Sequence, residues 1–211
     1  LGGTTVNILA VNNSGKIMAR AKIMTEAEKG PLDTVERIAA AAKKMVSDTG
    51  LTMKSVWRAG MGTPGPLDSK KGEIYGPVNL KGWGTVKLKA LMTKALGVPT
   101  IIDNDANCAV YGEKWIGAAK NAGNVVGLTL GTGIGGGVVV DGKLVRGTNY
   151  NAGEIGHMSL NPDGRKCNCG ARGCFERYCS ATGIAITAKE KIENVANVNN
   201  ENKEEEEENS N

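Results

Sequence analysis

One short stretch of the chain concentrates side chains that bind metal ions. The segment EIGHMSLNPDGRKCNCGARGCFE begins at Glu154 and holds the only histidine of the 211 residues, His157, with three of the five cysteines. These cysteines are Cys167, Cys169 and Cys174. Three thiolates and one imidazole are the ligand set of a closed, tetrahedral structural zinc site. The sequence therefore predicts that these four side chains bind Zn²⁺.

Other uses of these cysteines are less well supported. Closely spaced cysteines make strained disulfides, and no secretory signal precedes them, which leaves free thiols as the main alternative. A zinc-ribbon interaction module would show paired C-x-x-C knuckles, whereas the chain has a single C-x-C. Cys108 and Cys179 fall outside the cluster, and we expect them to be small apolar core residues.

Two glutamates, Glu154 and Glu176, flank the predicted metal ligands. A four-coordinate ion does not need them as ligands. If the ion stiffens the loop, it fixes two carboxylates that can accept hydrogen bonds from a polyhydroxylated substrate. The alternative is that both are ordinary surface residues.

A second group of polar residues lies in IIDNDANCAV, where a predicted strand meets a predicted helix. Open α/β sheets bind their ligands at such strand ends. Asp105 is the candidate catalytic base, able to take a proton from a hydroxyl that attacks a phosphoryl group. Asn104 could hydrogen-bond the same substrate. Asp and Asn are also preferred helix N-caps, so any one of Asp103, Asn104 and Asp105 could serve only as a cap.

The sequence LGTGIGGG contains G-x-G-x-x-G, but not in the context of a dinucleotide-binding fold. That fingerprint opens a helix, whereas β-branched residues and a hairpin turn follow here. Glycines between two strands let backbone N–H groups form a nest for phosphate, unless the loop is a plain β-turn. The candidate phosphate contacts are Gly131, Thr132, Gly133, Gly135 and Gly136.

A similar loop opens the chain. Gly3, Thr4 and Thr5 precede a predicted strand and offer the same backbone and hydroxyl donors. Two such loops, one in each predicted domain, suggest a phosphate chain held between two lobes.

The elements that must position these residues alternate between strands and helices up to about residue 117. The opening residues predict a hairpin that turns at residues 12–15. Asp33 and Glu36 are spaced as a capping box for a helix that Gly50 ends. Further elements are predicted as a strand within 55–68, a helix over 85–97, a strand over 98–105 and a helix from Ala106 to about Gly117.

A strand-rich segment follows, and the two patterns together favour a mixed α/β architecture with two lobes. Strands are predicted at 124–130 and 135–140, with a turn at Asp141-Gly142. We predict an N-terminal lobe over 1–108 and a partial C-terminal lobe over 109–190. Residues 191–211 are rich in Asn and Glu and predict a solvated tail or a frayed helix end without chemistry.

The composition is that of a globular protein with a formal net charge of +4, and its basic residues are spread along the chain. No nucleic-acid partner is therefore implied. No apolar run is long enough to cross a bilayer, and the start lacks the features of a signal peptide. These observations predict a cytoplasmic protein.

Six motifs together resemble those of the ROK family (repressors, open reading frames, kinases), and most closely its bacterial glucokinases. Their order and spacing agree over residues 1 to about 190. They are GTPGPLD at 62–68, NLKGW at 79–83, DNDANCA at 103–109, LGTGIGGG at 130–137, AGEIGHM at 152–158 and CNCGARGCFE at 167–176.

The resemblance implies an actin-like, ribonuclease H-like fold of two lobes and ATP-dependent phosphorylation of a sugar 6-hydroxyl. Asp105 corresponds to the catalytic base, and His157 to a residue that binds zinc with one ring nitrogen and offers the other to the sugar. ATP and Mg²⁺ are the implied cofactors, and relatives are often dimers or tetramers. The implied sugar contacts are Gly65, Asn79, Asn104, Asp105, Glu154, His157 and Glu176.

The chain departs from the family at both ends. Family members usually carry an aspartate two residues before G-G-T, and the chain starts at Leu1, one residue too late for it. A large C-terminal part with the adenosine-side loop is also absent, so we expect a truncated C-terminal lobe. Weak or no kinase activity follows from that expectation. Glucose is the best match, while fructose, mannose and N-acetylmannosamine remain open as substrates. The alternative is a sugar-responsive ROK repressor without its upstream DNA-binding domain. Asp105 and the intact phosphate loop favour the kinase over this alternative.

Overall fold

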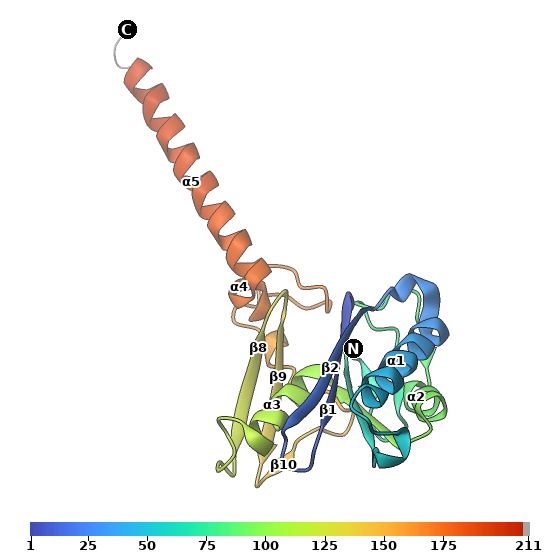
Figure 1. Cartoon of the computed structure of the whole chain (residues 1–211). Coiled ribbons are helices and arrows are strands. Elements are labelled where there is room, and N and C mark those ends of the chain that lie inside the picture. The colour runs from blue at the N-terminus through green and yellow to red at the C-terminus, as the bar shows by residue number, and fades with distance from the viewer. Residues whose placement is uncertain (209–211) are drawn as a thin grey trace. The chain divides into compact units, whose positions relative to one another are not determined.

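The computed structural model describes residues 1–208 (Figure 1), and the positions of side chains through residue 195. By its internal contacts the chain divides into two compact units. The first consists of Leu1–Gly127 and Gly137–Gly153, and the second of Leu128–Gly136 together with the chain from Glu154 onward. The lobes over 1–108 and 109–190 stay a prediction.

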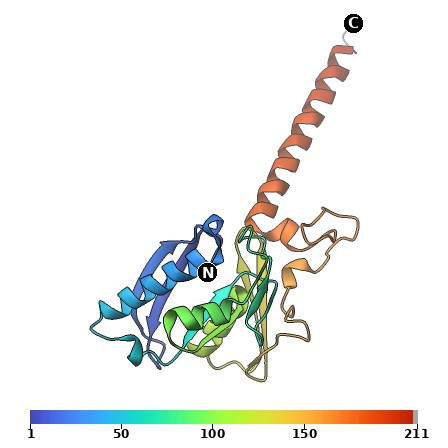
Figure 2. The same ribbon diagram turned by 90° about the vertical axis from the view of Figure 1, so that its right-hand side faces the viewer.

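The first unit opens with the predicted hairpin. Strand β1 (Thr5–Val11) pairs antiparallel with β2 (Ile17–Met24), and Gly15 adopts φ +83° in the turn between them. Helix α1 (Gly30–Ser47) packs against both strands and runs along the hairpin (Figure 2).

The predicted capping box of α1 is wrong. The helix begins at Gly30, one turn earlier than the box requires, with Pro31 in its first turn, where the fixed φ of proline suits a helix start. Asp33 is therefore inside the helix, where it accepts a hydrogen bond from Arg37 Nε at 2.6 Å instead of capping.

A parallel strand pair carries the DND motif. Strand β3 (Ala59–Thr63) pairs with β7 (Thr100–Asn104) so that Gly62 lies opposite Asp103 and Thr63 opposite Asn104. Helix α2 (Leu88–Leu96) precedes β7 and ends at Gly97, which has φ +74° as a left-handed C-cap. Helix α3 (Asp105–Ile116) follows β7 without a break.

A small antiparallel sheet lies between β3 and α2 in the sequence. Its strands are β4 (Leu67–Asp68), β5 (Glu73–Tyr75) and β6 (Thr85–Val86), in the order β4-β5-β6. Trp83 Nε1 donates to Ala27 O at 3.0 Å, and the buried indole joins the core. Helix α1 lies beside α2 (Figure 1). The core includes Val6, Val35, Ile38, Ile74, Leu80, Trp83, Leu88, Met92 and Ile102.

Three antiparallel strands follow α3, as the sequence predicts. They are β8 (Val125–Leu130), β9 (Ile134–Val140) and β10 (Lys143–Leu144), in the order β10-β9-β8. Asp141 and Gly142 both have positive φ in the turn between β9 and β10. Short 3-10 turns lie at Ala27–Lys29, Met53–Ser55 and Ile155–His157.

The second unit contains the cysteine-rich segment and the last two helices. Helix α4 (Glu176–Cys179) is one turn long and leads into α5 (Ala181–Glu208). Figure 1 shows α5 as one continuous helix, so residues 191–208, predicted as a solvated tail or frayed helix end, are helical; residues 209–211 lie outside the described part. Within the described residues, no helix is long and apolar enough to span a membrane.

Candidate functional site

Asp105 lies at the carboxyl edge of the β3–β7 pair, with its side chain exposed. Because the strands are parallel, the chain leaves both at the same edge, and the loop with Gly65 starts beside Asn104. A Cβ placed on Gly65 would lie 3.8 Å from Asn104 Nδ2. The structure thus brings together three predicted substrate contacts of the first unit.

Asn104 is the N-cap of α3. Its Oδ1 accepts from the backbone N–H of Ala106 at 2.9 Å and of Asn107 at 3.1 Å. The cap alternative raised for the DND motif is therefore confirmed for Asn104. The cap uses the amide oxygen and leaves the Nδ2 group as a donor, so capping does not compete with substrate binding.

Asp103 is held by an ion pair that the sequence did not reveal. Arg146, in the loop after β10, donates to Asp103 Oδ2 through Nε at 2.8 Å and Nη2 at 2.7 Å. Asp103 Oδ1 accepts from the backbone of Asn104 at 2.9 Å and from Asn107 Nδ2 at 3.2 Å. Both carboxylate oxygens are occupied, so Asp103 fixes the turn that carries Asn104 and Asp105.

The opening glycine loop lies against another predicted sugar contact. A Cβ on Gly3 would lie 2.7 Å from Asn79 O and 3.2 Å from Asn79 Cβ. Thr4 and Gly3 are exposed, and Thr5 begins β1. The backbone of Asn79 therefore requires glycine at position 3, and the predicted phosphate loop and NLKGW motif are neighbours.

The four predicted metal ligands meet in the second unit. One ligand atom from each of His157, Cys167, Cys169 and Cys174 lies within 4.8 Å of all the others. Cys169 Sγ is 3.6 Å from Cys174 Sγ, and Cys167 Sγ is 3.7 Å from His157 Nδ1. A tetrahedral zinc ion with Zn–S bonds near 2.3 Å requires ligand separations of about 3.6–3.8 Å. The residues therefore fit zinc.

Two glycines shape the loop that carries the cysteines. Gly170 and Gly173 adopt φ +94° and +70°, a conformation that other residues disfavour. The backbone N–H of Cys167 donates to Ala171 O at 2.9 Å, and that of Gly170 donates to Cys167 O at 3.1 Å. The tight turn brings Cys167 and Cys169 close to each other and to the other two predicted ligands.

The thiols of the cluster have shifted pKa values. Burial raises the pKa of Cys167 to about 12 and also raises the pKa of Cys174. A hydrogen bond from the backbone of Ala171 lowers the pKa of Cys169. Buried thiols ionise only with a cation nearby, which is what a metal ion provides.

Both flanking glutamates lie beside His157. Its Nε2 is 4.0 Å from Glu154 Oε2, and its Nδ1 is 3.8 Å from Glu176 Oε1. The ring therefore presents Nδ1 to the cysteines and Nε2 to Glu154. Glu154 is half exposed at its side chain, whereas Glu176 is 19% exposed. Together with Nε2, these two carboxylates form a polar group next to the cluster.

Only the first three residues of the predicted phosphate loop at 131–136 form a bend, and the others belong to β9. Gly131, Thr132 and Gly133 form the turn, in which Gly131 N–H donates to Gly133 O at 3.0 Å. Gly135 and Gly136 are already in β9, and Gly136 is buried. Among the predicted contacts of this loop, Gly131 and Thr132 are exposed, and Gly133 and Gly135 are partly buried.

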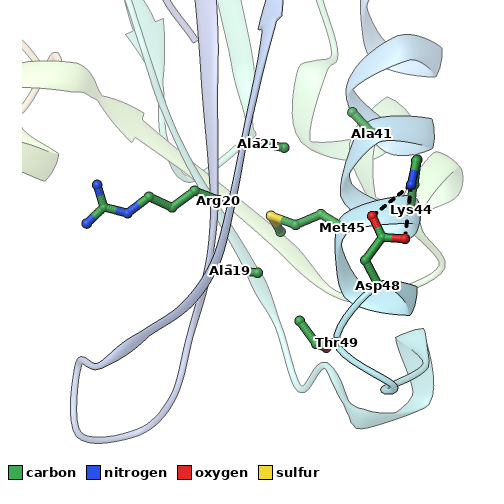
Figure 3. A pocket seen from close by; sticks show the side chains of 8 residues that line it. All are labelled: Ala19, Arg20, Ala21, Ala41, Lys44, Met45, Asp48 and Thr49. Carbon is green, nitrogen blue, oxygen red and sulfur yellow. Dashed lines mark hydrogen bonds and ion pairs between the residues drawn. The ribbon is translucent and has the colours of Figure 1, made fainter.

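A shallow pocket of about 350 Å³ lies elsewhere in the first unit, between β2 and α1 (Figure 3). Ala19 and Ala21 point toward α1, whereas Arg20 points away from it. At its rim Lys44 pairs with Asp48 at 2.8 Å. None of the predicted site residues lines this pocket.

The two cysteines outside the cluster are predicted to be core residues. Cys108 is exposed on α3, so that prediction is wrong for Cys108, and Cys179 is half-buried.

Comparison with known proteins gives consistent results. A sequence profile of the ROK family matches residues 1–209. The glucokinase of Halalkalibacterium halodurans is 40% identical over 91% of this chain and 58% of its own length. The solved ROK family glucokinase of Streptomyces griseus, in complex with glucose and AMPPNP, superposes with a TM-score of 0.76 at 32% identity, over 93% of this chain and 61% of that one.

Repressors are also similar to the chain. The xylose repressor of Caldicellulosiruptor bescii is 30% identical over 92% of this chain and 48% of its own length. The chain spans a little over half the length of the glucokinase it matches. The predicted α/β, actin-like fold class is confirmed by the solved sugar kinases.

Proposed function

Since the chain belongs to the ROK family, we propose that it serves in the ATP-dependent phosphorylation of a hexose at its 6-hydroxyl, with glucose as the first candidate. The observation that carries the proposal is the exposed Asp105 carboxylate beside Asn104, at the carboxyl edge of β3 and β7. The similarity to glucokinases supports it.

In this proposal Asp105 is the general base. Its carboxylate accepts the proton of the sugar hydroxyl while that oxygen attacks the γ-phosphorus of ATP and ADP leaves. Asp105 Oδ1 accepts from Ala106 N–H at 2.9 Å, which orients the carboxylate at the helix start. Asn104 keeps its Nδ2 donor for a sugar hydroxyl. Asp103 and Arg146 hold the turn in place.

The remaining roles follow the predicted set. Donors and acceptors for the sugar would come from Gly65, Asn79, Glu154, His157 and Glu176. Phosphate oxygens would be bound by Gly3, Thr4 and Thr5 and by the loop of Gly131, Thr132, Gly133, Gly135 and Gly136. Mg²⁺ would arrive with the nucleotide, held by phosphate oxygens and water. Zinc in the cysteine cluster would be structural and would brace Glu154 and Glu176.

The test is Asp105→Asn. Asparagine can keep the acceptor for Ala106 N–H but cannot take a proton, so phosphoryl transfer should fall by about 10²–10⁴-fold while hexose binding is retained. Asp48→Asn, another exposed carboxylate of the same unit, is the control. Transfer is measured in a coupled assay and binding by calorimetry with a panel of hexoses.

Turnover is measured on the 211-residue chain and on a chimera. In the chimera, residues 1–190 replace the matching part of the Halalkalibacterium halodurans glucokinase. Weak turnover of the 211 residues alone stays a prediction, as do the two lobes over 1–108 and 109–190 and assembly into a dimer or tetramer. Normal transfer by Asp105→Asn would remove Asp105 from its role, and absence of hexose binding by both proteins would reject the proposal.

Similarity to xylose repressors favours one second function, sugar sensing without phosphorylation. A sensor would bind its sugar equally well with Asp105 or asparagine and would transfer no phosphate in the chimera. Calorimetry and the coupled assay therefore separate the two functions.

A further inference from the structure

Glu176 touches two functional elements at once. Its Oε1 faces the Cys/His cluster, where it accepts a hydrogen bond from the protonated, metal-free Cys167 thiol at 3.3 Å and lies 3.8 Å from His157 Nδ1. Its Oε2 faces the glycine loop and accepts from the backbone N–H of Ile134 at 3.4 Å. The carboxylate thus connects the Cys/His cluster to Ile134, the first residue of β9, which lies 42 positions before Glu176 in the chain.

The glycine loop rests on this part of the unit at two more points. The backbone N–H of Ala181, the first residue of α5, donates to Gly131 O at 3.0 Å. Gly156, next to His157, packs directly against the backbone of Ile134, so that a Cβ there would collide with Ile134 O. Backbone contacts from both sides of the cluster thus place the loop, and Glu176 adds a side-chain contact.

Gly133 leaves the room that this contact needs. A Cβ at position 133 would lie 2.7 Å from Glu176 Oε2. Gly131, two residues earlier, has no atom within 4 Å of an added Cβ. Neither glycine has the positive φ that disfavours alanine. Alanine at 133 would therefore push the carboxylate away at little cost to the fold, and alanine at 131 would not.

We propose that Glu176 is a positioning residue that couples the Cys/His cluster to residues 131–134, so that metal in the cluster fixes the glycine loop. Because zinc displaces the proton of the Cys167 thiol, the coupling in the loaded chain acts through position: metal orders the backbone that carries Glu176, two residues after Cys174, and Oε2 keeps its bond to the Ile134 N–H. The coupling is reciprocal: if metal binding stabilises the loop arrangement, the loop arrangement increases the affinity for metal by the same free energy. The inference rests on the proposed function only in assigning the loop to phosphate; the coupling itself requires neither sugar nor ATP.

Amide hydrogen exchange at Ile134 tests the coupling. In the zinc-loaded chain the Ile134 amide should be protected by its bond to Glu176. In Gly133→Ala, which displaces the carboxylate, and in Glu176→Ala, which removes it, exchange should be faster by about tenfold or more, since the lost bond is to a charged acceptor. Gly131→Ala should exchange like the wild type. Removing zinc with a chelator should accelerate exchange in the wild type and leave Gly133→Ala nearly unchanged.

Zinc affinity gives a second readout, measured by competition with a chromophoric chelator. Gly133→Ala should bind zinc about tenfold more weakly, which is the lower end of the loss in metal affinity usual when a residue that supports metal ligands is displaced. Gly131→Ala should bind zinc like the wild type. Equal Ile134 exchange in zinc-loaded wild type and Gly133→Ala, or equal zinc affinity of the two glycine variants, overturns the proposal. If the metal-free chain unfolds, the zinc-loaded comparison still decides. Lack of kinase activity would affect the proposed function alone.

Discussion

Asn104 shows how one side chain can have a structural and a chemical use. The amide oxygen caps α3, while the amide nitrogen faces the loop of Gly65. An aspartate would keep the oxygen acceptor and lose the nitrogen donor, and an alanine would lose both. Substitution can therefore separate the cap from the proposed sugar contact.

Asn104→Ala should lower the free energy of unfolding by about 0.5–2 kcal/mol, the usual cost of losing an N-cap. Asn104→Asp should keep most of that stability, because a carboxylate also caps and suits the helix N-terminus. Both variants should bind glucose more weakly. Urea unfolding and calorimetry measure the two effects, and glucose affinity unchanged in Asn104→Asp would show that the amide is not a sugar contact.

At the scale of elements, Arg165 joins the cysteine-rich loop to α4 and α5. Its guanidinium donates to Arg177 O at 2.7 Å, to Thr187 Oγ1 at 3.0 Å and to both carboxylate oxygens of Glu190. It also lies 4.7 Å from the centre of the Tyr178 ring. The Arg165 side chain is 16% exposed, so its bonds to Arg177 and Thr187 are partly shielded from water, whereas Glu190 is half exposed. The planar guanidinium suits this arrangement better than the single ammonium of lysine.

Arg165→Lys should therefore destabilise the chain by about 1–3 kcal/mol, because two partly buried acceptors and the Glu190 carboxylate lose donors. The control is Lys189→Ala, which removes an exposed ion pair to Glu193 on the same helix and should cost less than about 1 kcal/mol. Thermal unfolding of the zinc-loaded protein, followed by circular dichroism, measures both. Equal losses in the two variants would contradict a role for Arg165 in holding the loop.

For the whole molecule, bound metal should link stability to pH. Burial raises the pKa of Cys167 to about 12 and raises that of Cys174. Without metal, the folded chain keeps protons that the unfolded chain releases near the ordinary thiol pKa, so its stability should fall as the pH rises above that value. Zinc reverses the sign, because it binds the thiolates and displaces their protons.

We expect zinc to raise the melting temperature, and the increase to shrink as the pH falls from about 8 to about 6, where protons compete for the thiolates. Zinc binding should also acidify a weakly buffered solution. Melting curves with zinc and with a chelator, recorded across this range, measure the effect. A zinc-induced increase that is independent of pH would argue against thiolate ligands.

Much of the local structure could be predicted from the sequence, because it depends on neighbours in the chain. Gly97 ends α2, the turn at Asp141-Gly142 closes a hairpin, and the spacing of Cys167 and Cys169 fits one side of a tight loop. Backbone preferences and ligand chemistry act over a few residues, so the sequence predicted the four side chains that meet as a possible metal site and the helix after the DND motif. The capping box of α1 failed because Pro31 offered an earlier start.

The tertiary structure alone decided which distant residues meet. Arg146 reaches Asp103 across 43 positions, Glu176 reaches Ile134 across 42, and Gly3 lies against Asn79. No periodicity or short motif encodes such pairs, because they depend on strand register and on the path of the loops between the elements. The sequence alone therefore identifies the side chains that can bind metal or accept a proton, whereas the contacts that hold them in position form only when the chain has folded.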